Sequence, residues 1–354
     1  MKIFEYSSYD VEHFFDSKTK TDSQFDKILL SEWSRLMNTD GIFKFRLDHP
    51  LPTRILSGEH KFVVQQNSKR YSEKRPSQIQ TKSDINIPFD DGKFNFNKIK
   101  SQEFLLKLNH LDENKNFNDD FIIINNSPIE QGHCLIVPKL HSNQNQVLNI
   151  DSVKLAVDLM LLSASTNIVI GYNSVQAYAS VNHLHMHLYY LNSVKNESGF
   201  PFPIQIVSNA QKLSQYLWFL NEEITLMPAF SVQLSDFDQN LLKFSKFIYL
   251  IIEYFVQKNL PHNLVLVKSS PYGVCSEQVT VRAVVWPKRP ACDVVSNNMG
   301  INFAMCELAG HFFLPNDEDF DKITEEFLFG VANDAKLDSI ELEIIKQDLV
   351  KIFN

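Results

Sequence analysis

The spacing of apolar residues divides the first half of the chain into short elements. Residues 25–37 repeat apolar side chains at helical spacing, which predicts a helix. Shorter apolar runs at residues 61–65, 121–124 and 132–138 predict strands, and Asn, Ser and Pro residues form a turn between the last two. Asp151 is placed to cap a further helix that runs to about residue 165, because its carboxylate can accept the free N–H groups of the first turn.

The segment beyond this helix has the most distinctive pattern of the chain. A strand is predicted at residues 168–173, and residues 182–190 then form an apolar, aromatic run in which His183, His185 and His187 occupy alternate positions. If this run is a strand, all three imidazoles point to one face. Imidazoles titrate near neutral pH and rarely fill a core, so that face is predicted to be a reaction site or a metal site.

The second half repeats this plan without the three histidines. A helix is predicted over residues 238–258, and strands are predicted over residues 263–267 and 279–286. Residues 303–313 would take the place of the histidine strand, and they contain one histidine, His311.

These patterns predict an α+β fold, in which an antiparallel sheet with flanking helices is built from two pseudo-repeats. Residues 1–24 are predicted to be a polar N-terminal segment, of which residues 1–20 are loosely ordered. Residues 25–195 form the repeat with the histidines, and residues 196–354 form a degenerate second repeat that becomes helical from residue 319 onward.

Composition narrows the class of protein. Of the 354 residues, 44% are hydrophobic and 21% are charged, as in an ordinary soluble globular protein. The net charge of −8 argues against nucleic acid or an anionic membrane as a partner, because both require a basic face. The most apolar stretch, residues 244–256, contains Lys246 and Glu253, which predicts a buried amphipathic helix rather than a membrane span.

The cysteines and the first residues indicate a cytoplasmic protein. Cys134, Cys275, Cys292 and Cys306 lie far apart without Cys-x-x-Cys spacing, which predicts reduced thiols. Residues 1–11 have no apolar run of the kind that a secretory signal needs.

Two chemistries fit a face with three imidazoles. A catalytic zinc ion takes two or three neutral imidazoles and keeps one position open for water. A nucleophilic histidine instead needs the correct tautomer and neighbouring donors for a phosphoryl group. Small and hydrogen-bonding residues upstream, Gly171, Asn173 and Ser180, favour phosphoryl or nucleotidyl transfer, and no His-Glu-x-x-His or Cys-x-x-Cys motif accompanies the histidines. A zinc-dependent hydrolase is the alternative.

The histidine segment resembles the signature of the histidine-triad superfamily, His-apolar-His-apolar-His. Residues 132–139 are similar to the Gly-His-x-Leu-apolar-apolar-Pro-Lys strand of that superfamily. From about residue 25 to residue 330 the chain resembles one branch, GDP-D-glucose phosphorylase, a relative of GDP-L-galactose phosphorylase. The motifs that carry this resemblance are Phe25-Asp26 with Trp33, Gly41-Ile42-Phe43, Pro52-Thr53-Arg54-Ile55-Leu56, Lys74-Arg75-Pro76, Pro88-Phe89-Asp90, the run from Phe94 to Ile99, Gly171-Tyr172-Asn173-Ser174, and the run from Cys306 to His311.

The resemblance implies a galactose-1-phosphate uridylyltransferase-like fold and a reaction without a cofactor or a metal. GDP-glucose and inorganic phosphate would give GDP and glucose 1-phosphate. His185, the middle histidine, would attack the α-phosphorus and form a guanylyl-histidine, from which phosphate would release GDP. His183 and His187 would orient this nucleophile and hydrogen-bond the phosphoryl oxygens.

Other residues are candidates for binding the substrate or phosphate. Ser180 matches a hydroxyl that assists the leaving group, or it satisfies the backbone at a strand end. Asn173 matches an asparagine near the phosphate or ribose, or it serves a turn, since Asn tolerates left-handed backbone. Arg282 and three basic pairs either contact phosphate or are solvated. The remaining candidates are Asn182 and Lys139, and the basic pairs are Lys69-Arg70, Lys74-Arg75 and Lys288-Arg289.

His187 leaves alternatives open. This position is usually Gln in the GDP-L-galactose branch and in the uridylyltransferases, so a histidine favours the glucose branch, with a nucleotide hydrolase as the alternative. A non-enzymatic nucleotide-binding protein is a third hypothesis, against which the intact triad argues. Glu307 and His311 are either neighbours of the site or polar groups of the core.

Overall fold

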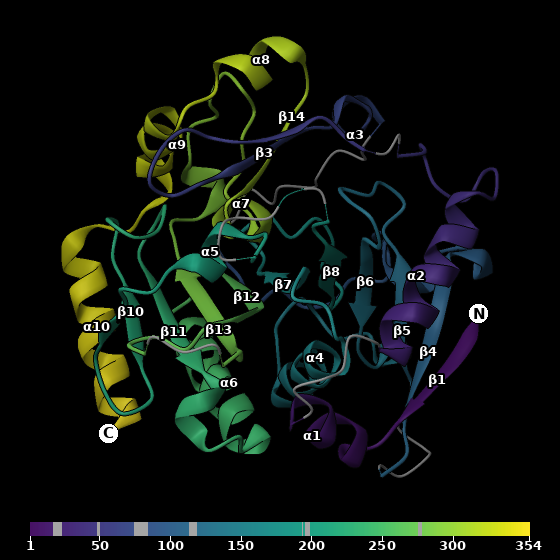
Figure 1. Ribbon diagram of the computed structural model, residues 1–354, viewed down its shortest axis with the longest axis horizontal. Coiled ribbons are helices and arrows are strands. Elements are labelled where there is room, and N and C mark those ends of the chain that lie inside the picture. Colours follow the sequence, from purple (N-terminus) through teal and green to yellow (C-terminus); the bar gives the residue numbers. More distant parts are fainter. Residues whose placement is uncertain are drawn as a thin grey trace.

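The computed structural model describes residues 1–16, 23–47, 50–73, 84–112, 119–192, 194, 199–274 and 278–354. The predictions for Lys74-Arg75 and Cys275 therefore lie outside the described residues. Figure 1 shows a wide sheet across the molecule, with helices on one side of it and a smaller layer on the other.

Runs of aliphatic and aromatic residues pair into one sheet of eleven strands in the described part of the chain. Neighbouring strands are antiparallel except at one edge, where β1 and β4 are parallel, so the sheet is mixed rather than purely antiparallel. In spatial order the strands are β1 (Lys2–Tyr6), β4 (Phe104–His110), β5 (Asp120–Ile124), β6 (Cys134–Val137), β8 (Met186–Tyr190), β7 (Ile168–Asn173), β12 (His262–Ser269), β13 (Thr280–Pro287), β11 (Ala229–Gln233), β10 (Trp218–Leu220) and β9 (Gln211–Lys212).

The two halves of this sheet have the same connectivity. One half has the spatial order β5-β6-β8-β7 and the other β10-β11-β13-β12, and they meet where β7 pairs with β12. In chain order, a helix joins the second and third strands of each set: α4 (Ile150–Leu162) joins β6 to β7, and α6 (Leu241–Gln257) joins β11 to β12. β13 therefore stands in the place of the histidine strand β8. The prediction that residues 303–313 take this place is wrong, because they form α7 (Met305–Leu308) and β14 (His311–Leu314) outside the main sheet.

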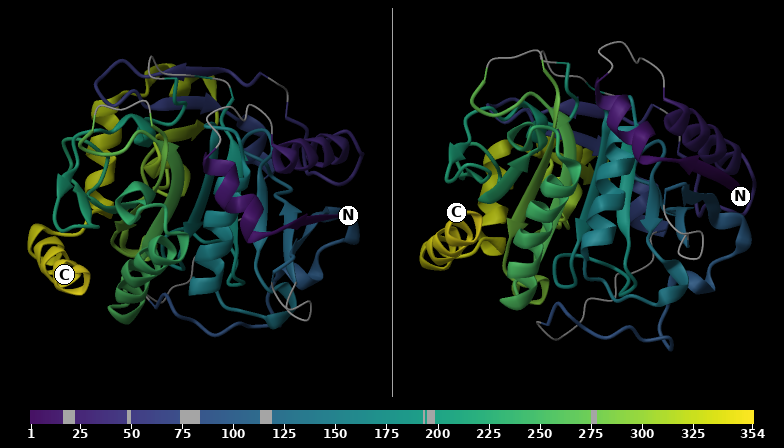
Figure 2. Two further views of the ribbon diagram at one scale, coloured as in Figure 1. Left: turned by 60° about the horizontal axis from the view of Figure 1, so that its bottom comes forward. Right: turned by 90° about the horizontal axis from the view of Figure 1, so that it is seen from below.

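Helices cover one face of the sheet. In Figure 2, α4 and α6 lie side by side along this face. Ile170 of β7 and Leu188 of β8 share one core with Phe244 and Ile252 of α6, which confirms the predicted buried amphipathic helix. No helix among the described residues is long and apolar enough to cross a bilayer. The same core includes residues of α1 (Ser8–Asp16), α2 (Gln24–Met37) and α10 (Ser339–Phe353).

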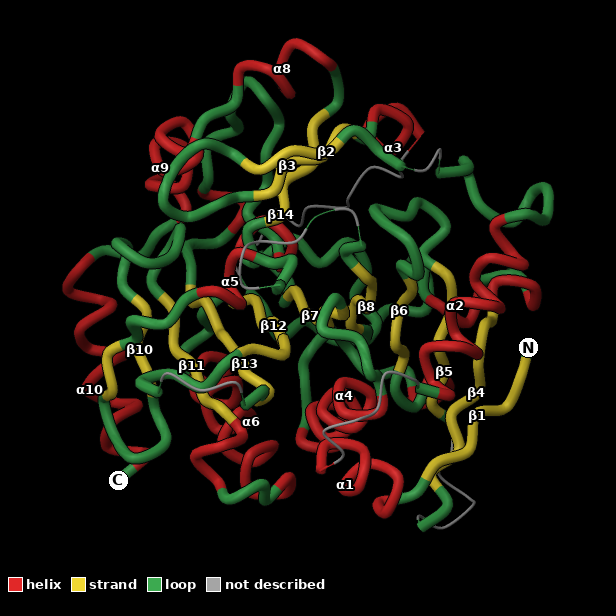
Figure 3. Tube along the Cα trace, in the orientation of Figure 1, coloured by secondary structure: helices red, strands yellow, loops and turns green. Residues whose placement is uncertain are grey.

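A second, smaller sheet covers the opposite face. Its strand order is β14-β3-β2, with β14 parallel to β3, so the layer joins a strand from the end of the chain to strands from its beginning (Figure 3). Gly171 allows this layer to approach, because a Cβ on Gly171 would lie 1.9 Å from the Cε atom of Met305. The remaining elements of this layer are β2 (Thr53–Ile55), β3 (Val63–Gln66), α3 (Ser68–Glu73), α5 (Pro203–Ile206), α8 (Asp317–Lys322) and α9 (Glu325–Ala332).

Two local predictions are wrong. The first residues are not loosely ordered, because β1 pairs with β4 and buries Phe4 and Tyr6, and α1 follows it. Asn149, and not Asp151, caps α4: its Oδ1 atom accepts the N–H of Ser152 at 2.9 Å. Asp151 lies in the first turn of α4, where its carboxylate interacts favourably with the positive end of the helix dipole.

The buried edge strand β1 can be tested with two substitutions on opposite faces. Phe4 is 7% exposed and Ile3 is 63% exposed. We expect Phe4→Ala to lower the free energy of unfolding by roughly 3–5 kcal/mol and Ile3→Ala to lower it by less than about 0.5 kcal/mol. Urea unfolding of both variants measures the difference, and equal losses would show that β1 is not part of the core.

Candidate active site

A cavity of about 540 Å³ opens on the face of the sheet that carries the histidines. This volume lies within the roughly 300–1,000 Å³ that small-molecule sites usually have. Both halves of the chain contribute to its walls. Residues 70–71 of α3, residues from the segment 300–307 and Phe313 line the cavity together with His187 of β8. The site is therefore assembled between the main sheet and the smaller layer.

The histidine segment is a strand only in its second half. β8 begins at Met186, so His187 lies in the strand while His183 and His185 precede it. Met186 packs in the core on the helix side, whereas His185 and His187 line the cavity on the opposite face. The chain bends at residues 180–183, and His183 does not line the cavity. The structure thus brings two of the three imidazoles into the site.

The side chain of Gln146 fixes the backbone where β7 and the histidine segment separate. Its Nε2 atom donates to the carbonyls of Asn173 and His185 at 2.9 and 3.0 Å, and its Oε1 atom accepts the N–H of His185 at 2.9 Å. Gln146 is fully buried and takes over the hydrogen bonds that a neighbouring strand would make. No motif in the sequence indicates this role of Gln146.

His185 is held in one tautomer. Its Nδ1–H donates to the carbonyl of His183 at 2.8 Å, so Nε2 carries the lone pair, an assignment that follows from the hydrogen-bond network. Nε2 has no partner among the described residues, and the ring lines the cavity. Burial lowers the pKa of His185 to about 4, and the ring of Phe96 packs edge-on against it. His185 is therefore neutral at pH 7, with a nucleophilic nitrogen toward the cavity.

A second histidine outside the triad orients His187. The Nδ1 atom of His133 accepts the N–H of Ile129 at 3.0 Å, so its proton is on Nε2, which lies 3.1 Å from Nδ1 of His187. His133 thus donates to His187, whose own proton must be on Nε2. His187 lines the cavity and presents an N–H donor beside the His185 nucleophile. His133 is part of the Gly-His motif, which was the signal that could have identified it.

His183 acts through its backbone. Its Nδ1 atom accepts the N–H of Phe96 at 3.2 Å, and its Nε2–H donates to the carbonyl of Leu140 at 3.0 Å. Burial lowers the pKa of His183 to about 4. Because both nitrogens have backbone partners, the expectation that His183 hydrogen-bonds phosphoryl oxygens does not fit this geometry, whereas its carbonyl does orient His185.

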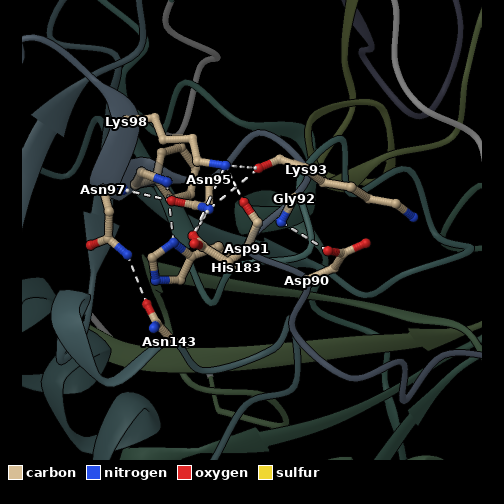
Figure 4. Close-up of polar contacts among 10 residues, drawn as sticks. Asp90, Asp91, Gly92, Lys93, Asn95, Asn97, Lys98, Asn143 and His183 are labelled. Carbon is tan, nitrogen blue, oxygen red and sulfur yellow. Dashed lines mark hydrogen bonds and ion pairs between the residues drawn. The ribbon is translucent and has the colours of Figure 1, made fainter.

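The segment over His183 comes from one of the motifs of the resemblance. Phe89 and Phe96 contact the His183 ring, with centroids 5.1 and 5.4 Å away. Figure 4 shows that the turn of residues 90–98, with Asn95 near its centre, lies beside His183. The turn is held by hydrogen bonds of Asn95 to Asp91, of Lys98 to the carbonyl of Lys93, and of Asn97 to Asn143.

Ser180 and Asn173, two of the predicted binding residues, both line the cavity. Ser180 is exposed on the cavity wall, with no hydrogen-bond partner in the described part of the chain. Asn173 lines the cavity at the end of β7, and its Oδ1 atom accepts from Asn263 at 2.7 Å and from the N–H of Met305 at 2.9 Å. These bonds leave the Nδ2 group of Asn173 as a donor for a ligand.

Three predicted binding residues lie outside the cavity. Asn182 accepts the N–H of Gln146 and donates to the carbonyl of Ile87, so its amide has a structural role. Lys139 is on another surface, where Nζ lies 2.6 Å from the carboxylate of Asp151. Arg282 is 1% exposed on β13, where it stacks 3.6 Å over the ring of Tyr272 and donates to backbone carbonyls.

The basic pairs differ from one another. Arg70 lines the cavity, whereas Lys69 is exposed outside it. Lys288 is fully buried behind the cavity, where Nζ donates to the carbonyl of Phe303 at 2.6 Å and lies 4.5 Å from the ring centre of Tyr178, a cavity residue. Burial lowers the pKa of Lys288 to about 7.

Glu307 and His311 take different roles. Glu307 lines the cavity, and its Oε2 atom accepts the N–H of Ala304 at 3.1 Å. His311 is fully buried in the core, 3.2 Å from the hydroxyl of Tyr189, and burial lowers its pKa to about 3. Glu307 is therefore a neighbour of the site and His311 a core group.

The arrangement does not resemble a zinc site. A metal needs free imidazole nitrogens that converge, but His183 uses both of its nitrogens on backbone groups. Among the described residues, no three His, Cys, Asp or Glu side chains are grouped to hold a metal ion. Cys134, Cys292 and Cys306 form no disulfide with one another in the described part of the chain.

Comparisons with known proteins agree on the relationship of the chain. The descriptions "GDPGP1-like, N-terminal domain" and "GDPGP1-like, C-terminal domain" match residues 24–189 and 229–354. GDP-D-glucose phosphorylase 1 of Danio rerio is 35% identical over 334 residues, 93% of this chain and 91% of its own. The Homo sapiens protein of that name is 30% identical over 94% of this chain and 84% of its own. Yeast Ap4A phosphorylase Apa2 in complex with Ap4A has the same fold, with a TM-score of 0.60 and 11% identity over 90% of this chain and 99% of that chain.

The bridging role of Gln146 can be tested by removing its amide. Gln146→Leu leaves the N–H of His185 and two carbonyls without partners, so we expect a loss of roughly 2–5 kcal/mol in the free energy of unfolding. Gln102→Leu is the control, because Gln102 is exposed. Thermal unfolding of both variants measures the effect, and similar small losses in the two would contradict the role of Gln146.

Proposed function

The chain belongs to the GDPGP1-like family, and from this membership we propose that it is a GDP-D-glucose phosphorylase. The reaction converts GDP-glucose and inorganic phosphate to GDP and glucose 1-phosphate. The observation that carries the proposal is the neutral His185, whose Nε2 faces a cavity of about 540 Å³ beside the N–H of His187. A nucleophile and a donor so arranged suit transfer of a nucleotidyl group.

In the first half-reaction, His185 displaces the sugar phosphate. The Nε2 lone pair attacks the α-phosphorus, and the bond from phosphorus to the bridging oxygen breaks. Glucose 1-phosphate leaves as a stable anion that needs no proton. The adduct keeps the Nδ1 proton of His185, and the carbonyl of His183 stabilises the positive charge of the ring. His187, Ser180 and Asn173 supply donors for the phosphoryl oxygens.

In the second half-reaction, an oxygen of inorganic phosphate attacks the same phosphorus. The bond from phosphorus to Nε2 breaks, GDP forms, and His185 returns to its neutral form with the proton still on Nδ1. Each half-reaction inverts the configuration at phosphorus once, so the overall transfer retains that configuration.

Product analysis tests this function. With GDP-glucose, we expect the wild-type protein to release GDP only when phosphate is present, and His185→Asn to lose at least about 1,000-fold in rate because the nucleophile is absent. Chromatography of the nucleotides measures both. GMP as the main product with or without phosphate would identify a hydrolase, and unchanged turnover by His185→Asn would exclude the nucleophile.

The same assay with a panel of GDP-, UDP- and ADP-sugars tests the selectivity for the base. The glucose and L-galactose forms of the GDP-sugar within this panel compare the two alternatives for the hexose. His141→Asn is the control variant, because the His141 side chain is 65% exposed and lies outside the cavity.

The pH dependence of adduct formation tests the environment of His185. Its pKa is lowered to about 4, so the nucleophile is neutral at pH 5 and above and becomes protonated as the pH falls through about 4. We therefore expect the burst of glucose 1-phosphate, measured in a single turnover without phosphate, to have a constant rate from pH 8 to about pH 5. A midpoint near pH 6.5, as for an ordinary imidazole, would contradict the burial of His185.

A further inference from the structure

Of the predicted basic pairs in the described part of the chain, Arg70 is the residue that lines the cavity. It lies on α3, a short helix after β3, and is thus supplied by the smaller layer rather than by the histidine repeat of the sheet. Its backbone N–H donates to the side chain of Asn67 at 3.2 Å, and its guanidinium carbon lies 5.9 Å from the ring centre of Phe313. These contacts hold the side chain against the cavity wall.

Hydrogen bonds connect Arg70 to the turn at residues 125–127, which contacts the wall that carries His187. One amino group of Arg70 donates to the carbonyl of Ser127 at 2.5 Å, and the N–H of Ser127 donates to Asn125 at 3.1 Å. The Nδ2 atom of Asn125 lies 3.3 Å from Nε2 of His133, so this turn packs against the histidine that orients His187. The same turn therefore contacts both Arg70 and the histidine pair that places the N–H of His187 beside the nucleophile His185.

Arg70 is a cation without a carboxylate partner within 4 Å in the described part of the chain. Glu307 is near enough to act on it electrostatically, but its Oε2 atom is held by the N–H of Ala304. Burial lowers the pKa of Arg70, which means that its charge is poorly solvated. A guanidinium has five N–H donors, and the hydrogen bond to Ser127 uses one of them, so most remain for an anion in the cavity.

We propose that Arg70 selects phosphate as the acceptor: its guanidinium binds the phosphoryl group that leaves with the sugar and then the inorganic phosphate that replaces it. This inference rests on the proposed function. Both groups are phosphate anions that bond to the same phosphorus from the side opposite His185, so one cation serves both half-reactions. An oxygen of inorganic phosphate attacks the phosphorus, and the bond from phosphorus to Nε2 breaks. The terminal phosphate of the new GDP then ionises, and its proton goes to solvent.

Water competes with phosphate for the guanylyl-histidine. Attack by water breaks the same bond and gives GMP, and a cation that concentrates phosphate next to the adduct favours GDP instead. The ratio of GDP to GMP therefore measures the selection of the acceptor directly. It does not depend on how fast the adduct forms or on the fraction of protein that is folded, because both products come from the same intermediate.

The experiment compares this ratio in the wild-type protein, Arg70→Gln and Arg70→Met with GDP-glucose and subsaturating inorganic phosphate. Loss of charge-assisted hydrogen bonds should lower the ratio by about 10- to 100-fold in both variants. Arg70→Met keeps the apolar stem against Phe313, so it serves if Arg70→Gln does not fold. Lys69→Gln is the matched control, since it removes one positive charge at an exposed neighbouring position, and it should keep the wild-type ratio.

The outcomes separate this inference from the function on which it rests. If the wild-type protein makes GDP and the Arg70 variants keep its ratio, the role of Arg70 is wrong and the phosphorylase remains. A Lys69→Gln ratio as low as that of the Arg70 variants would also overturn it, because the effect would then be one of overall charge. If the wild-type protein makes GMP regardless of phosphate, both proposals fall.

Discussion

The side-chain amide of Gln146 lies where β7 and the histidine segment separate, and the geometry of the site depends on it. A sheet that simply ended there would leave buried backbone groups without partners, at a cost of about 1–3 kcal/mol each. The amide satisfies them and fixes the backbone of His185 from both sides. With that backbone fixed, Nδ1 of His185 reaches the carbonyl of His183, and the lone pair of Nε2 is directed to the cavity.

Local patterns predicted the parts of the fold that depend on neighbouring residues. The strands around residues 121–124 and 168–173, the helix at 25–37 and the alternation of Met186 with His187 all follow from short-range spacing, and the structure has them. The edge strand β1 was missed because five residues, Lys-Ile-Phe-Glu-Tyr, are too short a pattern to predict a strand, and they gain their order from β4, about a hundred residues later.

The residues of the site also fall into those that short-range patterns predict and those that depend on distant parts of the chain. His185 and His187 could be predicted because they belong to one segment, and His133 could have been, from the Gly-His motif. Gln146 could not, because it reaches the site through a long connection and belongs to no pattern of its own. Arg70 was a candidate only as a member of one of three basic pairs, and short-range spacing does not show which of them reaches the cavity. Arg282 was misassigned for a related reason: a strand arginine suggests a surface charge, but β13 is covered on both faces and the guanidinium stacks on Tyr272.

The two halves of the sheet have diverged in role although their connectivity is the same. β8 and the residue before it carry His187 and His185 toward the cavity, whereas β13, in the corresponding place, carries Trp286 into the core on that face. The C-terminal half contributes a wall instead: residues 300–307 reach across β7, where Gly171 leaves room for Met305. The N–H of Met305 binds Asn173, so the wall is attached to the end of the strand next to the nucleophile.

The electrostatics of His185 bear on the choice between phosphate and water. A group that deprotonates water works best with a pKa near the operating pH, and burial has moved the pKa of His185 to about 4. Such an imidazole is a poor base, but it is fully available as a nucleophile at neutral pH and it is also a good leaving group from the adduct. Phosphate reaches the adduct already ionised and needs no base, whereas water does. A neutral, buried nucleophile therefore suits phosphorolysis, in which both the departing and the entering groups are anions and neither half-reaction requires a proton transfer to or from the protein.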